Sequence, residues 1–194
     1  MDDKVHTDIG AASETPPHVL NEPVPAASGR IGRLIDKVSV VFAFGFLLST
    51  AIILYEIVAR YIFDAPTIWV HETTTFLCGI CFIFGGLYAQ ARDRHIRVVL
   101  IYDAVPPGAR RVLDVVISVV GFVTMLFFAY AAWTTASKAI FTPQGVFRLE
   151  TTGSAWNPVY PGLVKLFLFL VICLMAVQFV VLAVNYARGR GGRR

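Results

Sequence analysis

The sequence is poor in the residues on which soluble, disulfide-bonded or metal-binding domains depend. Only 15% of its 194 residues are charged, and it contains only three cysteines and four histidines. The cysteines all lie inside long apolar runs, so we expect no disulfide framework. The first 30 residues lack an apolar core after an early basic cluster, and we therefore do not expect a signal peptide there. This composition excludes an ordinary soluble domain.

What the chain has instead is a set of long apolar runs. Hydrophobic residues make up 56% of the sequence, and a helix of ~20 mostly apolar residues is long enough to cross a bilayer. The runs are continuous rather than alternating, which argues against a β-barrel. They cover residues 38–61, 71–91, 112–138 and 161–186. The sequence therefore predicts an all-α integral membrane protein with four transmembrane helices.

Two polar tails flank the membrane domain, which we place at residues 31–187. Residues 1–30 are rich in Pro, Ala, Ser and acidic residues and offer too little apolar surface to become ordered. We predict that they form a flexible cytoplasmic tail, and that residues 188–194 form a basic cytoplasmic tail.

The distribution of basic residues predicts the orientation of the helices. Lys and Arg gather before the first apolar run, between the second and third, and after the fourth. Of the 17 basic residues, the exceptions are Arg60, Lys138, Arg148 and Lys165. Because basic loops stay on the cytoplasmic side, both termini are predicted to be cytoplasmic. The net charge of +4 is thus expected to contact phospholipid rather than nucleic acid.

The stretch from residue 56 to residue 72 marks the first exit from the membrane. Glu56 and Arg60 are four residues apart and hence within reach of each other on one helix face. Tyr61 and Trp69 suit a membrane interface, and Glu72 lies near the positive end of the next helix. An ionisable residue at membrane depth is a functional or assembly candidate. A private salt bridge that closes the helical hairpin explains Glu56 and Arg60 equally well.

Small residues recur at helical spacing in the second apolar run. Cys78, Cys81 and Gly85 share a face, with Gly79 and Gly86 beside them. Small side chains let helix backbones approach closely in lipid, and a buried thiol behaves as a small apolar group. We therefore predict a helix-packing surface here. Metal binding is the weaker hypothesis, because two cysteines three residues apart need further ligands nearby.

The loops and the last run contain further candidates. Residues 92–107 start with basic residues and continue with a mostly apolar stretch, which predicts a short interfacial helix. Residues 139–160 carry aromatic residues and predict a second short amphipathic segment on the outer surface. Gln178 lies deep in the fourth run and is expected to make an interhelical hydrogen bond worth about 0.6–2 kcal/mol.

Taken in order, several of these residues resemble a known family. The pattern is Glu56-x-x-x-Arg60-Tyr61-x-Phe63, then Pro66, Trp69 and Glu72, then an apolar run, and then His95-Ile-Arg97-Val98. It resembles the small membrane subunit of tripartite ATP-independent periplasmic (TRAP) transporters, the DctQ-like family, over about residues 34–186. The chain departs from the family pattern at His71 and Val99, where the family often has acidic residues.

The resemblance implies a function as well as a fold. It implies a heterodimer, in the bacterial inner membrane, with a larger multi-span subunit that carries the substrate and sodium sites. A periplasmic binding protein would deliver an organic acid, and the small subunit would enlarge the immobile scaffold. We therefore expect no enzyme activity, cofactor or metal site in this chain. The candidates for assembly or interface residues are Glu56, Arg60, Tyr61, Trp69, Glu72, His95, Arg97 and Gln178.

Two other classes of function stay open. A small homodimeric proton-coupled exporter would use Glu56 as its coupling carboxylate, although such a site belongs near the middle of the membrane and Glu56 has Arg60 as a potential partner. A redox membrane protein would need reactive thiols in its loops, or paired histidines at one depth. His71 and His95 would lie about 36 Å apart on a continuous helix, too far to share a haem.

Overall fold

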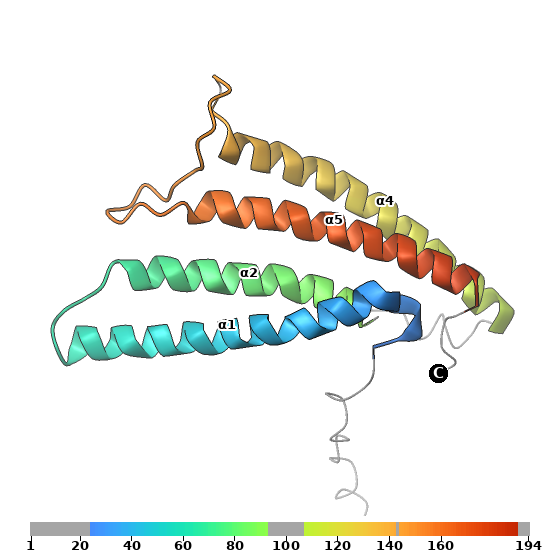
Figure 1. Cartoon of the computed structure of the whole chain (residues 1–194), viewed down its shortest axis with the longest axis horizontal. Helices are drawn as coiled ribbons and strands as arrows, with labels where there is room; N and C mark the ends of the chain where they lie inside the picture. Colours follow the sequence, from blue (N-terminus) through green and yellow to red (C-terminus); the bar gives the residue numbers. More distant parts are fainter. Residues whose placement is uncertain (1–23, 93–106, 143, 190–194) are drawn as a thin grey trace, which may run out of the picture.

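The computed structural model describes residues 24–92, 107–142 and 144–189 (Figure 1). Its elements in chain order are the short 3-10 helix η1 (Ala26–Ser28), α1 (Gly29–Tyr61), α2 (Trp69–Ala91), α4 (Pro107–Ile140) and α5 (Tyr160–Ala187). All four long helices are long and apolar enough to cross a membrane. The predicted all-α membrane class with four spans is therefore confirmed.

The four long helices lie side by side in a single layer, in the order α1, α2, α5, α4 (Figure 1). The main contacts run between α1 and α2, between α4 and α5, and between α2 and α5. The layer thus consists of two helical hairpins joined along a seam between α2 and α5. The apolar stretches of α1 and α4 are only 6% buried within the chain, against 28% for α2 and α5. The outer helices of the layer therefore leave most of their apolar surface open.

The two ends of this layer differ, and we name them by what they carry. The loop end carries the loops 62–68 and 141–159, and the tail end is the opposite one, where α1 begins and α5 ends. The helix bounds agree with the predicted spans to within two residues, except that α1 and α4 extend further at the tail end. Thus α1 begins at Gly29 rather than near residue 38, and α4 begins at Pro107 rather than near residue 112.

The start of α1 corrects one predicted boundary. We expected residues 1–30 to form a flexible tail, but residues 26–28 form η1 and α1 begins at Gly29. Ala27 is 1% exposed and Ser28 is fully buried. Their small side chains fit against α5 and the end of α2, so this short segment gains packing that its composition did not reveal.

Two clusters of buried side chains hold the layer together. The first joins α1, α2 and α5 through Ile35, Leu87 and Val171, and beside it Phe42 stacks on Phe84 with ring centroids 3.9 Å apart. The second cluster joins η1, α4 and α5 and consists of Ala27, Phe179, Leu182 and Tyr186, with Val115, Phe122 and Met125 packed against it. Because α5 contributes to both clusters, it is the element that connects the two hairpins.

The loop between α4 and α5 differs from the expected interfacial segment. Its described residues, 141–142 and 144–159, contain no helix. Phe141 and Phe147 form an isolated antiparallel bridge, and Gly145 and Gly153 adopt positive φ angles of 79° and 71°. The two glycine turns are eight residues apart, and a segment that short is too short to offset the unfavourable nucleation of a helix. The interfacial helix predicted for the loop 92–107 lies outside the described residues.

Candidate functional site

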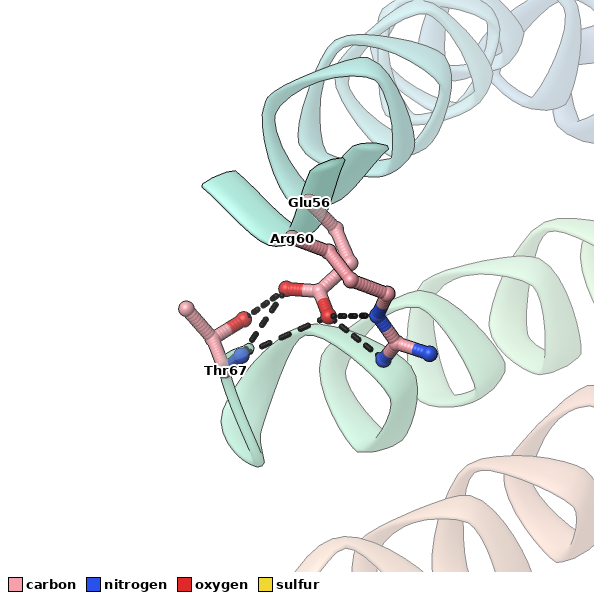
Figure 2. A network of polar contacts seen from close by, with 3 residues as sticks. All are labelled: Glu56, Arg60 and Thr67. Atoms are coloured by element: carbon pink, nitrogen blue, oxygen red, sulfur yellow. Dashed lines mark hydrogen bonds and ion pairs between the residues drawn. The ribbon is translucent and has the colours of Figure 1, made fainter. Parts of the chain in front are cut away.

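Two of the charged residues that the sequence singled out, Glu56 and Arg60, pair with each other at the loop end. One oxygen of the Glu56 carboxylate, Oε1, accepts hydrogen bonds from Arg60 Nε at 3.1 Å and Arg60 Nη2 at 2.6 Å (Figure 2). The other oxygen, Oε2, accepts one from the backbone N–H of Thr67 at 3.2 Å and another from the Thr67 hydroxyl. No side-chain hydrogen bond caps α2 at its N-cap residue, Ile68. Glu56 therefore fixes the start of α2 from the end of α1.

This arrangement favours the structural interpretation of Glu56. Its side chain is only 13% exposed, and both carboxylate oxygens are engaged within the α1–α2 hairpin. A coupling carboxylate has to exchange its proton with water or solute during transport, whereas both oxygens of this one accept hydrogen bonds from Arg60 and Thr67. The geometry therefore disfavours the exporter hypothesis. Arg60, in contrast, is 53% exposed and has donors left over.

A groove of about 650 Å³ opens beside this cluster. It lies between α1 and α2, and its lining includes Glu56, Arg60, His71 and Cys78. A smaller groove of about 210 Å³ lies between α4 and α5 near Lys165. Each groove belongs to one hairpin, so neither is a cavity enclosed by all four helices.

Aromatic residues surround the same end of the first hairpin. Trp69, at the start of α2, packs against Tyr55 of α1 with ring centroids 6.0 Å apart. Tyr61, the last residue of α1, is 79% exposed. Aromatic side chains in these positions are typical of the headgroup level of a membrane. The loop end therefore carries the kind of residues expected at a membrane interface.

Glu72 joins the two hairpins at the loop end. Its carboxylate accepts a hydrogen bond from the hydroxyl of Thr152 in the 141–159 loop, at 3.2 Å. One turn further along α2, Phe76 stacks on Tyr160 with ring centroids 4.4 Å apart. These contacts extend the α2–α5 seam to the loop end of the layer.

The tail end of the seam is held by polar groups around η1. Gln178 of α5 is fully buried, and its Nε2 donates a hydrogen bond to the carbonyl of Ser28 at 3.2 Å. The hydroxyl of Ser28 in turn donates to the carbonyl of Ala91 at the end of α2. Gln178 thus bonds to η1 rather than to one of the long helices. Through Ser28, this hydrogen-bond chain connects α5 with α2.

Sequence analysis missed three residues of this network, which are Ser28, Gln90 and Asn185. Gln90 of α2 donates to the carbonyl of Met175 at 3.0 Å, and Asn185 of α5 donates to the carbonyl of Ala27 at 2.8 Å. A signal was present for the two amides, since each is an isolated polar residue inside an apolar run, as Gln178 is. Ser28 gave no such signal, because it precedes the first apolar run.

Basic residues at the tail end also fix helix ends. Arg92, which follows α2, bonds to Asp36 Oδ1 of α1 through Nε at 2.9 Å and Nη2 at 2.6 Å. Arg111 of α4 donates to the carbonyls of Tyr186 and Ala187 at the end of α5, both at 3.0 Å. A guanidinium at a helix C-terminus satisfies carbonyls that have no helical partner. These arginines therefore close the hairpins in addition to any contact with headgroups.

Only part of the predicted packing surface of α2 packs within this chain. Cys81 is 2% exposed, its thiol lies 3.4 Å from the carbonyl of Phe42, and a Cβ on Gly45 would lie 2.9 Å from its sulfur. Small residues thus do bring α1 and α2 close together. Three glycines of the same helix have nothing within 4 Å of a Cβ position: Gly79, Gly85 and Gly86. Their role stays a prediction for contacts with another chain.

The remaining sequence candidates, His95 and Arg97, lie outside the described residues. Within residues 24–92, 107–142 and 144–189, no three His, Cys, Asp or Glu side chains come together to hold a metal ion. The three cysteines are free thiols. The redox hypothesis therefore gains no support from this part of the chain.

The fold and the end-clustered charges define a class, that of four-span membrane proteins built as two helical hairpins. The family model described as "Tripartite ATP-independent periplasmic transporters, DctQ component" matches residues 49–189. The chain belongs to this family, and the resemblance predicted from the sequence is confirmed.

A curated relative points the same way. The ectoine TRAP transporter small permease protein TeaB of Halomonas elongata is 34% identical to this chain over 109 residues. The match covers 55% of this chain and 56% of the relative. The chain thus spans about half the length of this relative.

Proposed function

We propose that this chain is the small permease subunit of a TRAP transporter and forms a heterodimer with a large multi-span membrane subunit. Its family and its similarity to a small permease protein support this assignment. The observation that carries the proposal is the single layer of helices (Figure 1) with an ion pair near each end, Glu56–Arg60 at the loop end and Asp36–Arg92 at the tail end. Such a layer offers broad apolar surfaces to a partner, and each of its two grooves stays within one hairpin.

In this role the layer extends the immobile scaffold of the transporter. A scaffold must keep its shape while the transport domain of the large subunit moves, and this layer is clamped at both ends. Glu56 and Thr67 close the first hairpin at the loop end, and Asp36 and Arg92 close it at the tail end. Exposed apolar side chains on the outer helices provide the surface for packing against the large subunit.

The activity of the complete transporter would be cation-coupled uptake of an organic acid. A periplasmic binding protein would deliver the solute. With both termini cytoplasmic, the loop end would face that protein, so the loops 62–68 and 141–159 would be the parts of this chain nearest to it. The related small permease protein is named for ectoine, and the large subunit and the binding protein would choose the solute in each system.

Co-expression tests the proposal. A tagged form of this chain, purified in mild detergent, is expected to retain the large subunit in equal amount. Uptake in liposomes is expected only when both membrane subunits and the binding protein are present. An unrelated four-span protein with the same tag serves as the control. Solute uptake by this chain alone would overturn the proposal.

A further inference from the structure

The groove between α1 and α2 has a chemistry that the scaffold role does not use. Its volume of about 650 Å³ lies in the range of small-molecule sites. Ile53 and Cys78 line its deep part, toward the middle of the layer, whereas Arg60, Tyr61 and His71 line its rim at the loop end. The walls of the groove thus change from apolar to polar along the helix direction, and the polar end holds the Glu56–Arg60 ion pair.

The positive charge at the rim is not fully used within the chain. Glu56, the acidic residue of the lining, directs both oxygens to Arg60 and Thr67. Arg60 is 53% exposed, and among the described residues its Nη1 has no partner (Figure 2). Thr74 adds a buried hydroxyl that finds no hydrogen-bond partner in the described chain. The rim therefore offers hydrogen-bond donors to an anion.

The depth of the groove decides which anion fits. Trp69 and Tyr55 pack together at the same end, where aromatic residues mark the headgroup level of a membrane. The rim, with the exposed guanidinium of Arg60, then lies beside lipid phosphates, and the apolar part of the groove lies beside acyl chains. We propose that the groove binds one phospholipid of the adjacent leaflet, with its phosphate at Arg60 and His71 and one acyl chain along Ile53.

A phospholipid fits better than the other obvious occupant, an acidic side chain of the large subunit. A carboxylate would bond to Arg60 at the rim but would leave the apolar part of the groove, near Ile53 and Cys78, unfilled. A phospholipid satisfies both parts with one molecule. This inference concerns the groove of the chain itself and does not depend on the transporter role.

Native mass spectrometry of the delipidated full chain, titrated with dioleoyl phosphatidylglycerol, tests the proposal. We expect one tightly retained lipid. Arg60→Gln should weaken its apparent Kd about tenfold, since a hydrogen bond to a charged group is lost. Thr75→Phe should also weaken binding, because Thr75 is an exposed lining residue and the larger ring fills the groove while Arg60 and His71 stay unchanged. Two controls lie outside the groove: Arg148→Gln removes an exposed charge at the loop end, and Thr134→Phe alters an exposed threonine of α4.

Three outcomes would overturn the proposal. The first is unchanged lipid retention in Thr75→Phe. If circular dichroism shows that Arg60→Gln does not fold, the result for Thr75→Phe is sufficient to test the proposal. The second is competition by glycerol 3-phosphate as strong as by the whole lipid, which would indicate a site for the headgroup only. The third is loss of the large subunit from Arg60→Gln with lipid retention unchanged, which would assign the rim to an acidic partner residue. Copurification of the large subunit with the unaltered chain is measured separately, so failure of the proposed function can be distinguished from failure of the lipid proposal.

Discussion

At the scale of single residues, the two partners of the loop-end ion pair are unequal. Glu56 bonds to Arg60 and also to Thr67, eleven residues further on, whereas Arg60 bonds only to Glu56 among the described residues. Glu56 is the residue that joins α1 to α2, and Arg60 supports it. The same inequality leaves Arg60 free to serve the groove.

We predict that Glu56→Gln lowers the midpoint of thermal unfolding more than Arg60→Gln does. The first change weakens the bonds to both Arg60 and Thr67, while the second leaves the Thr67 bonds in place. Circular dichroism of the purified chain in detergent measures the midpoint. Glu150→Gln is the control, because its ion pair with Lys165 is largely exposed and should contribute little. An equal loss in both variants would contradict this role for Glu56.

Ser28→Ala tests the hydrogen bond that crosses the seam at the tail end. Loss of the Ser28 hydroxyl leaves the Ala91 carbonyl without this donor, and we expect the free energy of unfolding to fall by about 0.6–1.7 kcal/mol. Unfolding by sodium dodecyl sulfate in mixed micelles measures it. Ser39→Ala is a matched control, because the Ser39 hydroxyl bonds only within α1, to the carbonyl of Asp36. Equal free energies of unfolding for the two variants would mean that η1 does not stabilise the seam.

Sequence alone could predict the local part of these sites and not the rest. Glu56 and Arg60 meet because residues four apart on a helix are neighbours whatever the fold. The partners of Thr67 and Ser28 depend on the path of a loop and on how α2 and α5 pack, and the Ser28–Ala91 bond spans 63 residues. No pattern within one segment carries that information.

At the scale of helices, α4 and α5 approach each other closely at one glycine. A Cβ on Gly121 would lie 2.5 Å from the ring of Phe179, which belongs to the second buried cluster. The close contact explains why this position of α4 has no side chain. The hairpin α4–α5 therefore depends on a small residue in the middle of a helix.

Gly121→Ala is expected to lower the free energy of unfolding by about 1–3 kcal/mol, because the added methyl group overpacks the contact with Phe179. The same mixed-micelle unfolding experiment measures this loss. Gly85→Ala is the matched control: nothing lies within 4 Å of its Cβ position, so the chain by itself should be unchanged or slightly stabilised. An equal effect of both changes would show that helix propensity, rather than packing, controls this site.

The extents of the helices were predictable where the membrane sets them. Hydropathy located all four spans, and their loop ends agree with the structure to within a few residues. The tail ends of α2 and α5 were also predicted to within one residue, whereas those of α1 and α4 were missed because these two helices continue through polar turns, beyond the part that hydropathy detects. The order of the helices in the layer was not predictable, since it follows from interdigitating side chains on faces that are apolar all round.

At the scale of the whole molecule, the orientation of the layer can be tested directly. The excess of basic residues at the tail end predicts that this end is cytoplasmic. A membrane-impermeant maleimide should therefore label Ser154→Cys on intact spheroplasts and label Arg33→Cys only after lysis. Both changes are made in a chain whose three native cysteines are replaced by alanine. The opposite labelling pattern would show that the predicted orientation is wrong.

A layer one helix thick has almost no interior of its own. Many of its apolar side chains are exposed within the chain, so the chain's own packing does not require them to be apolar. Lipid or a partner subunit would impose that requirement. If the proposed heterodimer forms, positions that tolerate polar substitution when the chain is expressed alone, yet lose function in the complex, should trace the outline of the proposed large subunit on this layer. A scan of substitutions read in both settings would map that footprint residue by residue.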